Sequence, residues 1–568
     1  MSRRLLALLG ACVLSAAAAA VPAQAADQPY SFRLLAKAQP DECFAGIGQP
    51  YPPGPPCAEG TPKVNQAYVW GLTKVGADVW FGTGANTHCL TSGATLDVLQ
   101  PTVNDNYVCE YGESQIAEND PDIPPEIGDQ RPPQVWLYNA RTRRAVDKSA
   151  EISRRSPQDA ERLRTTVGLR AAGTLQDVVL LGGPALGDSL NLFAFHARTH
   201  RFIGSVNLPA YGNIRTFLVA DRALYLGVGI GRNGGAGGAV LRWTGSARAP
   251  FRFQTVADLP VQAADLALHD GRIAATSWPA DQPTSQAMLA GVWISPPLAD
   301  GAPGLRPEDA AGWTQVWNAR QYETDRVISA TYGGGGIASY GGYLYWGTMH
   351  VPLKATKVHQ TLYPQSGDEA IALQVKNTQR AISIWRGKDL GGPGQRIELL
   401  YGESTLPAYD PATGTWADVP TGWTPKYGTS GFGYQFNNYT WRMAVTDGKL
   451  FVGTMDWSYL IQDIAGQVTG GGSDAVARVT RATMDSPTIP IDPDQYGGDL
   501  YMFPAAEAPA QAITKTGAGN YLNYGIRNMI VDRDGLYLGM ANPMNLRTDP
   551  DDDVPEGGWE LIRLTRNR

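Results

Sequence analysis

A short apolar segment that ends in glycine recurs along this chain, and few folds accommodate such a repeat. The clearest copies span residues 78–83, 223–228, 343–348, 449–454 and 535–540, and weaker copies span 177–183 and 271–276. Each copy follows another apolar segment and a tight polar turn, as the segment 442–448 does before 449–454. An apolar strand, an Asp-Gly turn and a second strand predict a β-hairpin. The chain is therefore expected to be a series of similar hairpins, and a long-helix or coiled-coil protein is excluded.

Further strand-like runs lie between these hairpins, at residues 134–138, 192–195, 239–243 and 381–385. Four strands in each unit, repeated radially, build a β-propeller, which leaves no long exposed sheet edge. The seven copies predict an all-β, seven-bladed β-propeller over residues 65–568, with blades that start near residues 65, 166, 213, 263, 328, 436 and 519. A two-sheet sandwich is the alternative, and the regular hairpin repeat argues against it.

The strands of Leu-Tyr-Leu-Gly type and the segment Tyr-Asp-Pro-Ala-Thr-Gly-Thr-Trp at residues 409–416 resemble those of secreted bacterial propellers in the broad kelch, WD-repeat and sialidase-like neighbourhood. The resemblance covers nearly the whole mature chain and implies architecture only. The Trp-Asp blade signature is absent from the sequence, and so is the Ser-x-Asp-x-Gly-x-Thr-Trp box of sialidases. Because propellers host many unrelated functions, the fold does not decide the function.

Composition narrows the class of partner. Hydrophobic residues make up 43% of the chain and charged residues 18%, which indicates a folded protein rather than a disordered one. The formal net charge is -7, so the sequence lacks the overall basic character of a nucleic-acid-binding protein, and no nucleic-acid partner is expected. The expected partner is a glycan or small-molecule ligand, and the protein is expected to be a monomer.

The N-terminus has the pattern of a secretory signal peptide. Arg3 and Arg4 precede an apolar, Ala-rich run, and Ala23-Gln24-Ala25 supplies small residues for cleavage. The sequence therefore predicts a signal peptide over residues 1–25, a secreted or periplasmic location, and an N-terminal arm over residues 26–64. No second apolar run is long enough to predict a transmembrane segment.

Cysteine usage agrees with export. Cys43, Cys57, Cys89 and Cys109 remain after the signal peptide, and an even number in an exported chain predicts two disulfides. We predict the sequential pairing, Cys43–Cys57 and Cys89–Cys109, among three possible connectivities. Both bonds are expected to pin the N-terminal region.

Residues at matched positions after the repeated glycines form a candidate site. In a propeller the loop after the second strand of each hairpin lies at the end where the innermost strands begin. The residue three after the glycine is His350, Asp456 or Asn542 in the last three copies, and Trp278 in the weaker copy. His350 is predicted to act as an acid or base, with Asp456 to orient it.

A second matched position precedes each repeated glycine. Arg215 and Arg527 lie 12 residues before Gly227 and Gly539, and Arg442 lies 11 before Gly453. Trp70 takes the equivalent place in the first copy, and the glycines at 333–336 are expected to leave room for a ligand beside His350. Arginines bind carboxylate or sulfate through forked hydrogen bonds. Flat faces for sugar rings are predicted on Trp278, Trp457 and Tyr524.

Three functions remain open on this evidence. The first is an extracellular enzyme, a lyase or a glycosidase, that acts on an acidic glycan. The second is a propeller that binds a glycan or protein without turnover, its arginines bridging blades or contacting the ligand. The third is a metal-assisted enzyme, because Asp549, Asp551 and Asp553 with Glu560 have the outer spacing of a calcium loop, although Val554 stands where a glycine is needed.

Overall fold

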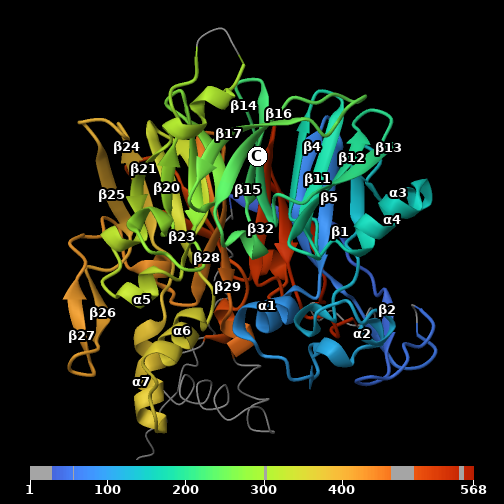
Figure 1. The fold of residues 1–568 in the computed structure, drawn as a ribbon, viewed down its shortest axis with the longest axis horizontal. Coiled ribbons are helices and arrows are strands. Elements are labelled where there is room, and N and C mark those ends of the chain that lie inside the picture. The colour runs from blue at the N-terminus through green and yellow to red at the C-terminus, as the bar shows by residue number, and fades with distance from the viewer. Residues whose placement is uncertain (1–28, 55–56, 300–302, 462–491, 549–555, 568) are drawn as a thin grey trace, which may run out of the picture.

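The computed structural model describes residues 29–54, 57–299, 303–461, 492–548 and 556–567. The fold is mostly β, with strands that stand side by side and short helices at the periphery (Figure 1). The predicted signal peptide and the acidic residues Asp549, Asp551 and Asp553 lie outside the described residues. None of the helices among the described residues is long and apolar enough to cross a membrane.

The strands form four-stranded antiparallel units, which we number in chain order. Unit 1 contains β4 (Gln66–Val75), β5 (Asp78–Ala85), β8 (Val135–Asn139) and β9 (Arg144–Asp147). Unit 2 contains β10 (Ala171–Leu175), β11 (Val178–Ala185), β12 (Ser189–His196) and β13 (Phe202–Leu208). Unit 3 contains β14 (Asn213–Ala220), β15 (Ala223–Gly229), β16 (Gly238–Trp243) and β17 (Phe253–Leu259). Unit 4 contains β18 (Gln262–His269), β19 (Arg272–Trp278), β20 (Gly291–Ile294) and β21 (Thr314–Asn318).

The last three units continue this order. Unit 5 contains β22 (Tyr332–Tyr340), β23 (Tyr343–His350), β24 (Ile384–Lys388) and β25 (Arg396–Tyr401). Unit 6 contains β28 (Asn437–Thr446), β29 (Lys449–Asp456), β30 (Leu500–Phe503) and β31 (Gln511–Thr514). Unit 7 contains β32 (Gly525–Asp532), β33 (Gly535–Ala541), β34 (Glu560–Arg566) and, from the other end of the chain, β1 (Tyr30–Lys37).

The first strands of successive units contact one another in a cycle. Strand β4 contacts β10, and the contacts continue through β14, β18, β22, β28 and β32 back to β4. Units 2, 3 and 4 are separate sheets, whereas single residue pairs such as Met349–Tyr439 join units 5, 6, 7 and 1 into one larger sheet. The first strands therefore surround a common centre.

Turn chemistry explains the hairpins between first and second strands. Asp447 and Gly448 both have positive φ, 51° and 67°, between β28 and β29. Asp and Gly tolerate this left-handed conformation, which suits the twist of a two-residue hairpin. The hairpin predicted at residues 449–454 is confirmed.

A β-bulge interrupts most of the first strands near their beginning. The register skips one residue in each case, and the skipped residues are Trp70, Arg215, Ala264, Trp441 and Arg527. A bulge leaves its extra residue unpaired and turns its side chain out of the regular alternation. The bulges therefore place four large side chains outside the regular alternation, where the first strands meet. These belong to Trp70, Arg215, Trp441 and Arg527.

The N-terminal region differs from the separate arm that the sequence predicts. Strand β1 pairs with β34 and completes unit 7, so part of residues 26–64 belongs to a sheet. Beyond β1, strand β2 (Glu42–Phe44) pairs with β3 (Thr61–Lys63). The predicted disulfides are confirmed, Cys43 with Cys57 and Cys89 with Cys109.

Insertions between the strands supply the helices and three small β pairs. The helices are α1 (Thr87–Leu96), α2 (Gln115–Asn119), α3 (Ser149–Arg155), α4 (Pro157–Arg164), α5 (Arg326–Ser329), α6 (Lys354–Leu362) and α7 (Asp368–Thr378). The remaining pairs are β6 (Thr102–Val103) with β7 (Val108–Cys109), and β26 (Thr405–Asp410) with β27 (Thr415–Pro420). In Figure 1, α1, α2, α6 and α7 lie together at the lower edge of the molecule. An aromatic cluster that includes Tyr68, Trp70, Trp441, Trp457 and Tyr524 packs with α1 residues there.

Candidate functional site

Four arginines from different units gather where the first strands meet, and we call them the arginine cluster. Arg215, Arg442 and Arg527 come from β14, β28 and β32, and Arg170 immediately precedes β10. Their charges act on one another, since Arg170 and Arg527 both influence Arg215, and Arg442 influences Arg527. The sequence predicted three of the four to face one site, and the structure brings these three together with Arg170.

Three of these arginines lie over tryptophan rings. The guanidinium carbon of Arg215 is 3.8 Å from the ring centroid of Trp278, that of Arg170 is 5.3 Å from Trp70, and that of Arg527 is 5.8 Å from Trp441. Stacking on an indole attracts the cation and fixes the plane of the guanidinium. The N–H groups lie in that plane, so they remain available for hydrogen bonds at its edges.

Each of the three tryptophan rings packs directly against a glycine from a neighbouring segment. A Cβ atom on Gly333 would lie 2.6 Å from the Trp278 ring, and one on Gly525 would lie 2.0 Å from Trp441. A Cβ on Gly168 would lie 2.2 Å from Trp70. Each ring therefore needs a glycine beneath it, and the Gly-Trp-Arg stacks hold the cluster in place.

One carboxylate pairs with this cluster among the residues that the structure describes. Arg442 forms an ion pair with Asp265 of β18 and lies within 3.4 Å of the Thr216 hydroxyl. Arg215 donates through Nε to Gln262 Oε1 at 3.0 Å, and Arg170 donates to Asn213 Oδ1 at 3.2 Å. Arg527 makes no hydrogen bond or ion pair with any described residue. Arg170, Arg215 and Arg527 therefore form no ion pair with a described carboxylate, although Asp265 attracts Arg527 from a greater distance.

Burial and mutual repulsion disfavour the charged form of these arginines, and their pKa values are lowered accordingly. Burial and then the like charges of Arg170 and Arg527 lower the pKa of Arg215 far below its ordinary range. Burial, followed by repulsion from Arg170 and Arg442, lowers the pKa of Arg527 to about 9. Burial lowers the pKa of Arg170 to about 10. Arg170 and Arg527 still carry their charge at neutral pH, but in an environment that disfavours it.

Two tyrosines complete the surroundings of the cluster. Tyr68 packs edge-on against Trp70 and Trp441, each at 5.8 Å, and Tyr439 packs against Trp441 at 5.4 Å. Burial raises the pKa of both phenols, although the nearby arginines oppose this shift. Both tyrosines are therefore neutral hydrogen-bonding groups at neutral pH and supply no negative charge.

The predicted acid–base pair lies in a different environment. His350 ends β23, is buried, and bonds through Nε2 to Thr348 Oγ1 at 3.0 Å, with the Tyr332 ring 4.4 Å away. Burial, with the positive charge of Arg380, lowers the pKa of His350 to about 3. The imidazole is thus neutral near pH 7. Its predicted catalytic role stays a prediction.

The Asp456 carboxylate serves its own loop. It accepts hydrogen bonds from the Ser458 backbone N–H and hydroxyl, each at 2.8 Å, and from the Gly497 N–H at 3.2 Å. Burial, opposed by these bonds, raises its pKa well above the ordinary value. The predicted role of Asp456 in orienting His350 stays a prediction.

The remaining predicted binding residues are largely enclosed. Asn542 is fully buried and donates to the Glu556 carbonyl oxygen at 2.7 Å. Trp457 and Tyr524 are buried in the aromatic cluster, where Tyr524 packs against Trp441 at 5.7 Å. These three side chains hold the loops over the cluster together, and a role in sugar stacking stays a prediction.

The expectation that the glycines at 333–336 leave room for a ligand is wrong. A Cβ on Gly334 would lie 2.6 Å from the Ser277 carbonyl oxygen, and one on Gly335 equally close to that of Thr440. On Gly336 a Cβ would lie 2.8 Å from the Arg442 backbone. These glycines permit close packing of β22 against its neighbours on both sides.

Arg170 was missed, although the sequence contains its signal. Gly168-Leu-Arg170 has the same form as Gly525-Ile-Arg527, and Arg170 lies 12 residues before Gly182. Gly182 pairs with Ala171, as Gly539 pairs with the residue after Arg527. Because glycines stand at both 182 and 183, the sequence does not show which of them matches the repeated glycine of the other copies.

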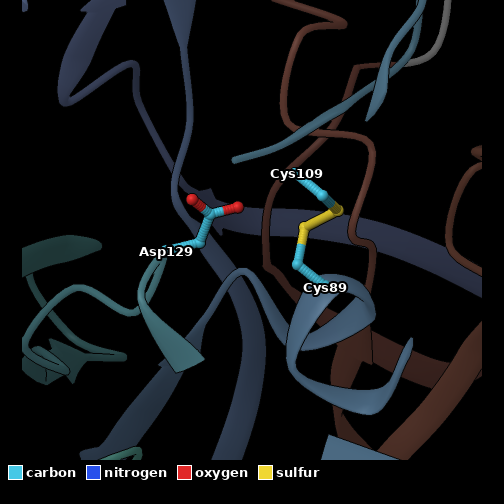
Figure 2. A group of neighbouring side chains, drawn as sticks. All are labelled: Cys89, Cys109 and Asp129. Carbon is cyan, nitrogen blue, oxygen red and sulfur yellow. A yellow bond between two sulfur atoms is a disulfide. The ribbon is translucent and has the colours of Figure 1, made fainter. Parts of the chain in front are cut away.

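One group of side chains has the spacing of metal ligands, Cys89, Cys109 and Asp129 (Figure 2). The two sulfur atoms are joined as a disulfide, so they are not thiolates and do not offer the usual metal ligand. The Asp129 carboxylate accepts a hydrogen bond from the Glu110 N–H. This group therefore fits a structural role.

No family model matches the chain, and no curated protein matches it in sequence. Several solved structures share a low overall similarity. The β-propeller domain of the trilobed protease from Pyrococcus furiosus is 8% identical, with 79% of this chain and 98% of that chain covered and a TM-score of 0.28. The GH43 endo-arabinanase from Bacillus licheniformis is 11% identical, with 50% and 87% covered and a TM-score of 0.23. The puromycin-hydrolysing peptidase from Mycobacterium tuberculosis is 10% identical, with 90% and 62% covered and a TM-score of 0.31. We base no functional argument on likenesses this low.

Proposed function

We propose that this chain is an exported, seven-bladed β-propeller that binds the acidic group of a carbohydrate at its centre. The cycle of contacts between the first strands of the seven four-stranded units supports this architecture. In this proposal residues 65–568 and β1 form the propeller, and residues 1–25 are a signal peptide removed on export. The disulfides are compatible with an oxidising compartment.

The surplus positive charge of the arginine cluster carries the ligand proposal. Arg170, Arg215 and Arg527 are held beside one another without a carboxylate partner among the described residues. Burying a charge without a partner costs roughly several kcal/mol of folding free energy, so a bound anion would stabilise the cluster. Carboxylate and sulfate groups accept the forked hydrogen bonds that guanidinium donates.

Both a catalytic and a non-catalytic protein can use such a site. A lyase or glycosidase needs a proton donor or acceptor, and His350 and Asp456 remain the predicted ones. The burial of both groups and their internal hydrogen bonds favour a protein that binds an acidic glycan without turning it over. The arginine cluster is required in either case.

The test measures binding and turnover with the same purified mature protein. Acidic and neutral polysaccharides are compared for affinity, for unsaturated products and for new reducing ends, with Arg527→Gln and His350→Ala beside the wild type. We expect affinity for acidic polysaccharides alone and its loss in Arg527→Gln. Turnover that disappears in His350→Ala identifies an enzyme. Equal affinity for neutral polysaccharides, or unchanged affinity in Arg527→Gln, contradicts the proposal.

A further inference from the structure

The arginine cluster carries more positive charge than one carboxylate neutralises. Asp265 compensates Arg442, which leaves Arg170, Arg215 and Arg527. A sugar carboxylate contributes one negative charge and two oxygens in a plane. One arginine binds both of these oxygens through a single fork. Two guanidinium groups would then remain buried and uncompensated.

The three uncompensated arginines come from different positions around the cycle of first strands. Arg170, Arg215 and Arg527 belong to units 2, 3 and 7, and each stacks on a different tryptophan, from units 1, 4 and 6. Their planes are therefore fixed independently of one another. Donors that reach one group from three sides match three terminal oxygens in a tetrahedral arrangement better than two oxygens in a plane.

A lysine from α6 adds further positive charge near Arg215. Lys354 is the first residue of α6, is half-buried, and is electrostatically close to Arg215. Burial is the largest cause that lowers its pKa, Asp281 opposes the shift, and Arg215 and Lys357 add to it. A lysine at a helix N-terminus also opposes the helix dipole. A bound anion with more than one charged oxygen relieves both effects.

The aromatic surfaces support recognition through the acidic group rather than the sugar ring. Trp278 packs against Gly333, and the Arg215 guanidinium lies over its ring at 3.8 Å. The Trp278 Nε1–H donates to the Gly334 carbonyl oxygen at 3.0 Å. This tryptophan is already engaged by the protein, so it orients Arg215 instead of offering a free face.

We propose that the arginine cluster takes a tetrahedral oxyanion ester of a sugar, a sulfate or phosphate group, and that Lys354 is a further ligand to it. The inference rests on the proposed function and narrows its substrate class. Arg170, Arg215 and Arg527 each present an N–H edge to one oxygen. Arg442 is paired with Asp265 and adds to the positive charge that acts on Arg527.

The experiment compares four sugars of one size: glucose 6-sulfate, glucose 6-phosphate, glucuronate and glucose, each titrated into the full chain by calorimetry. We expect one of the two esters to bind at least about tenfold tighter than glucuronate, which corresponds to about 1.4 kcal/mol. The preferred ester identifies sulfate or phosphate as the ligand group. Equal or tighter binding of glucuronate overturns the inference and leaves the proposed function intact. If none of the acidic sugars binds, inorganic sulfate and phosphate are titrated against chloride at equal ionic strength, and failure of these anions overturns both proposals.

Variants locate the site. Arg170→Gln and Arg527→Gln are expected to lower affinity for the preferred ester at least about tenfold, and Lys354→Gln about threefold to tenfold. Arg563→Gln is the matched control, because Arg563 is also buried and lies over an aromatic ring, Tyr537 at 4.5 Å, but pairs with Asp532. Unchanged affinity in Lys354→Gln removes Lys354 from the site. If an arginine variant does not fold, the slope of affinity against salt concentration in the wild type tests the same charges, and a flat slope contradicts the inference.

Discussion

Two regions of this molecule bury arginine, and they do so in opposite ways. At the junction between the N-terminal hairpin and unit 1, Arg131 donates to both oxygens of Glu42, at 2.9 and 2.8 Å, with Glu110 and Lys63 close by. Burial alone would lower the pKa of Arg131, but attraction to Glu42, together with Tyr51 and Asp129, outweighs burial and raises this pKa above its ordinary value. In the arginine cluster, burial and mutual repulsion lower the pKa of Arg215 and Arg527.

The difference separates a structural use of buried charge from a functional one. Arg131 finds its partner inside the chain, as Arg380 does in Glu323 at 2.7 and 3.0 Å. Such pairs hold segments together whether or not a ligand is present. In our proposal the arginine cluster is instead completed by a bound anion, which is the property expected of a binding site.

The largest predicted effect comes from removing Arg131 from its buried ion pair with Glu42. Arg131→Gln leaves Glu42 and Glu110 buried with one fewer cation, so we expect a loss of about 3–5 kcal/mol in the free energy of unfolding. Urea unfolding followed by tryptophan fluorescence measures it. Arg164→Gln, which breaks an exposed pair with Glu161, is the control and should cost less than about 1 kcal/mol. A loss as small as the control's would contradict the comparison.

The disulfide beside this junction should contribute nearly as much. Replacing Cys89 and Cys109 by serine opens a crosslink between residues 20 positions apart, and we expect a loss of about 2–4 kcal/mol. Unfolding of the double variant with and without reductant measures the effect. Wild-type protein and the variant should unfold alike when both are under reductant, because Cys43–Cys57 is then open in both, and a difference between them would mean that the serines themselves disturb the core.

The arginine cluster is predicted to respond with the opposite sign. Without ligand, Arg527→Gln removes one of three repelling charges, so the melting temperature should rise by a few degrees, or about 1 kcal/mol. Thermal unfolding at low salt measures it, and added salt should shrink the gain by screening the repulsion. A variant less stable than the wild type would show that Arg527 is compensated by the protein itself.

The last prediction concerns the pH dependence of a buried acid, Asp499. Burial is the main cause that raises the pKa of Asp499 from its ordinary 3.8 to about 7, against hydrogen bonds from Asn437 and Tyr501. Because the folded pKa is raised, its stabilising contribution is full below about pH 4 and is lost as pH rises through about 7. Asp499→Asn should flatten the fall in melting temperature between these pH values. An unchanged pH profile would mean that Asp499 does not titrate there.

Much of the fold was predictable because its signals are local. The Asp447-Gly448 turn identifies a hairpin by chemistry alone, and an even cysteine set in one region favours sequential pairing. Strand β1 was not predictable in this way, because its pairing with β34 joins segments at opposite ends of the chain. The sequence analysis assigned this segment to an N-terminal arm, and nothing local in it identifies β34 as a partner.

The candidate site was predictable where the repeat keeps its register and not elsewhere. Arg215 and Arg527 share one spacing and one bulge, so the sequence alone aligned them correctly. Arg442 lies one residue beyond its bulge, at Trp441, and meets Asp265 from a different unit. Asp456 and Asn542 occupy matched positions at the end of a strand, yet both side chains form hydrogen bonds with the loops that follow their own strands. Residue spacing predicts where a side chain leaves the backbone, whereas its local hydrogen-bond partners determine where its polar group lies.

The pairing of β1 with β34 also sets the order of events in folding. Tyr30–Lys37 is synthesised long before its partner Glu560–Arg566. Until then β1 has no sheet to join and unit 7 lacks its outer strand. Contacts this distant in sequence form slowly, because their ends must find each other across a long chain. Completion of unit 7 therefore waits until β34 has been made, and a variant without β34 would leave the edges of β1 and β33 exposed to other chains.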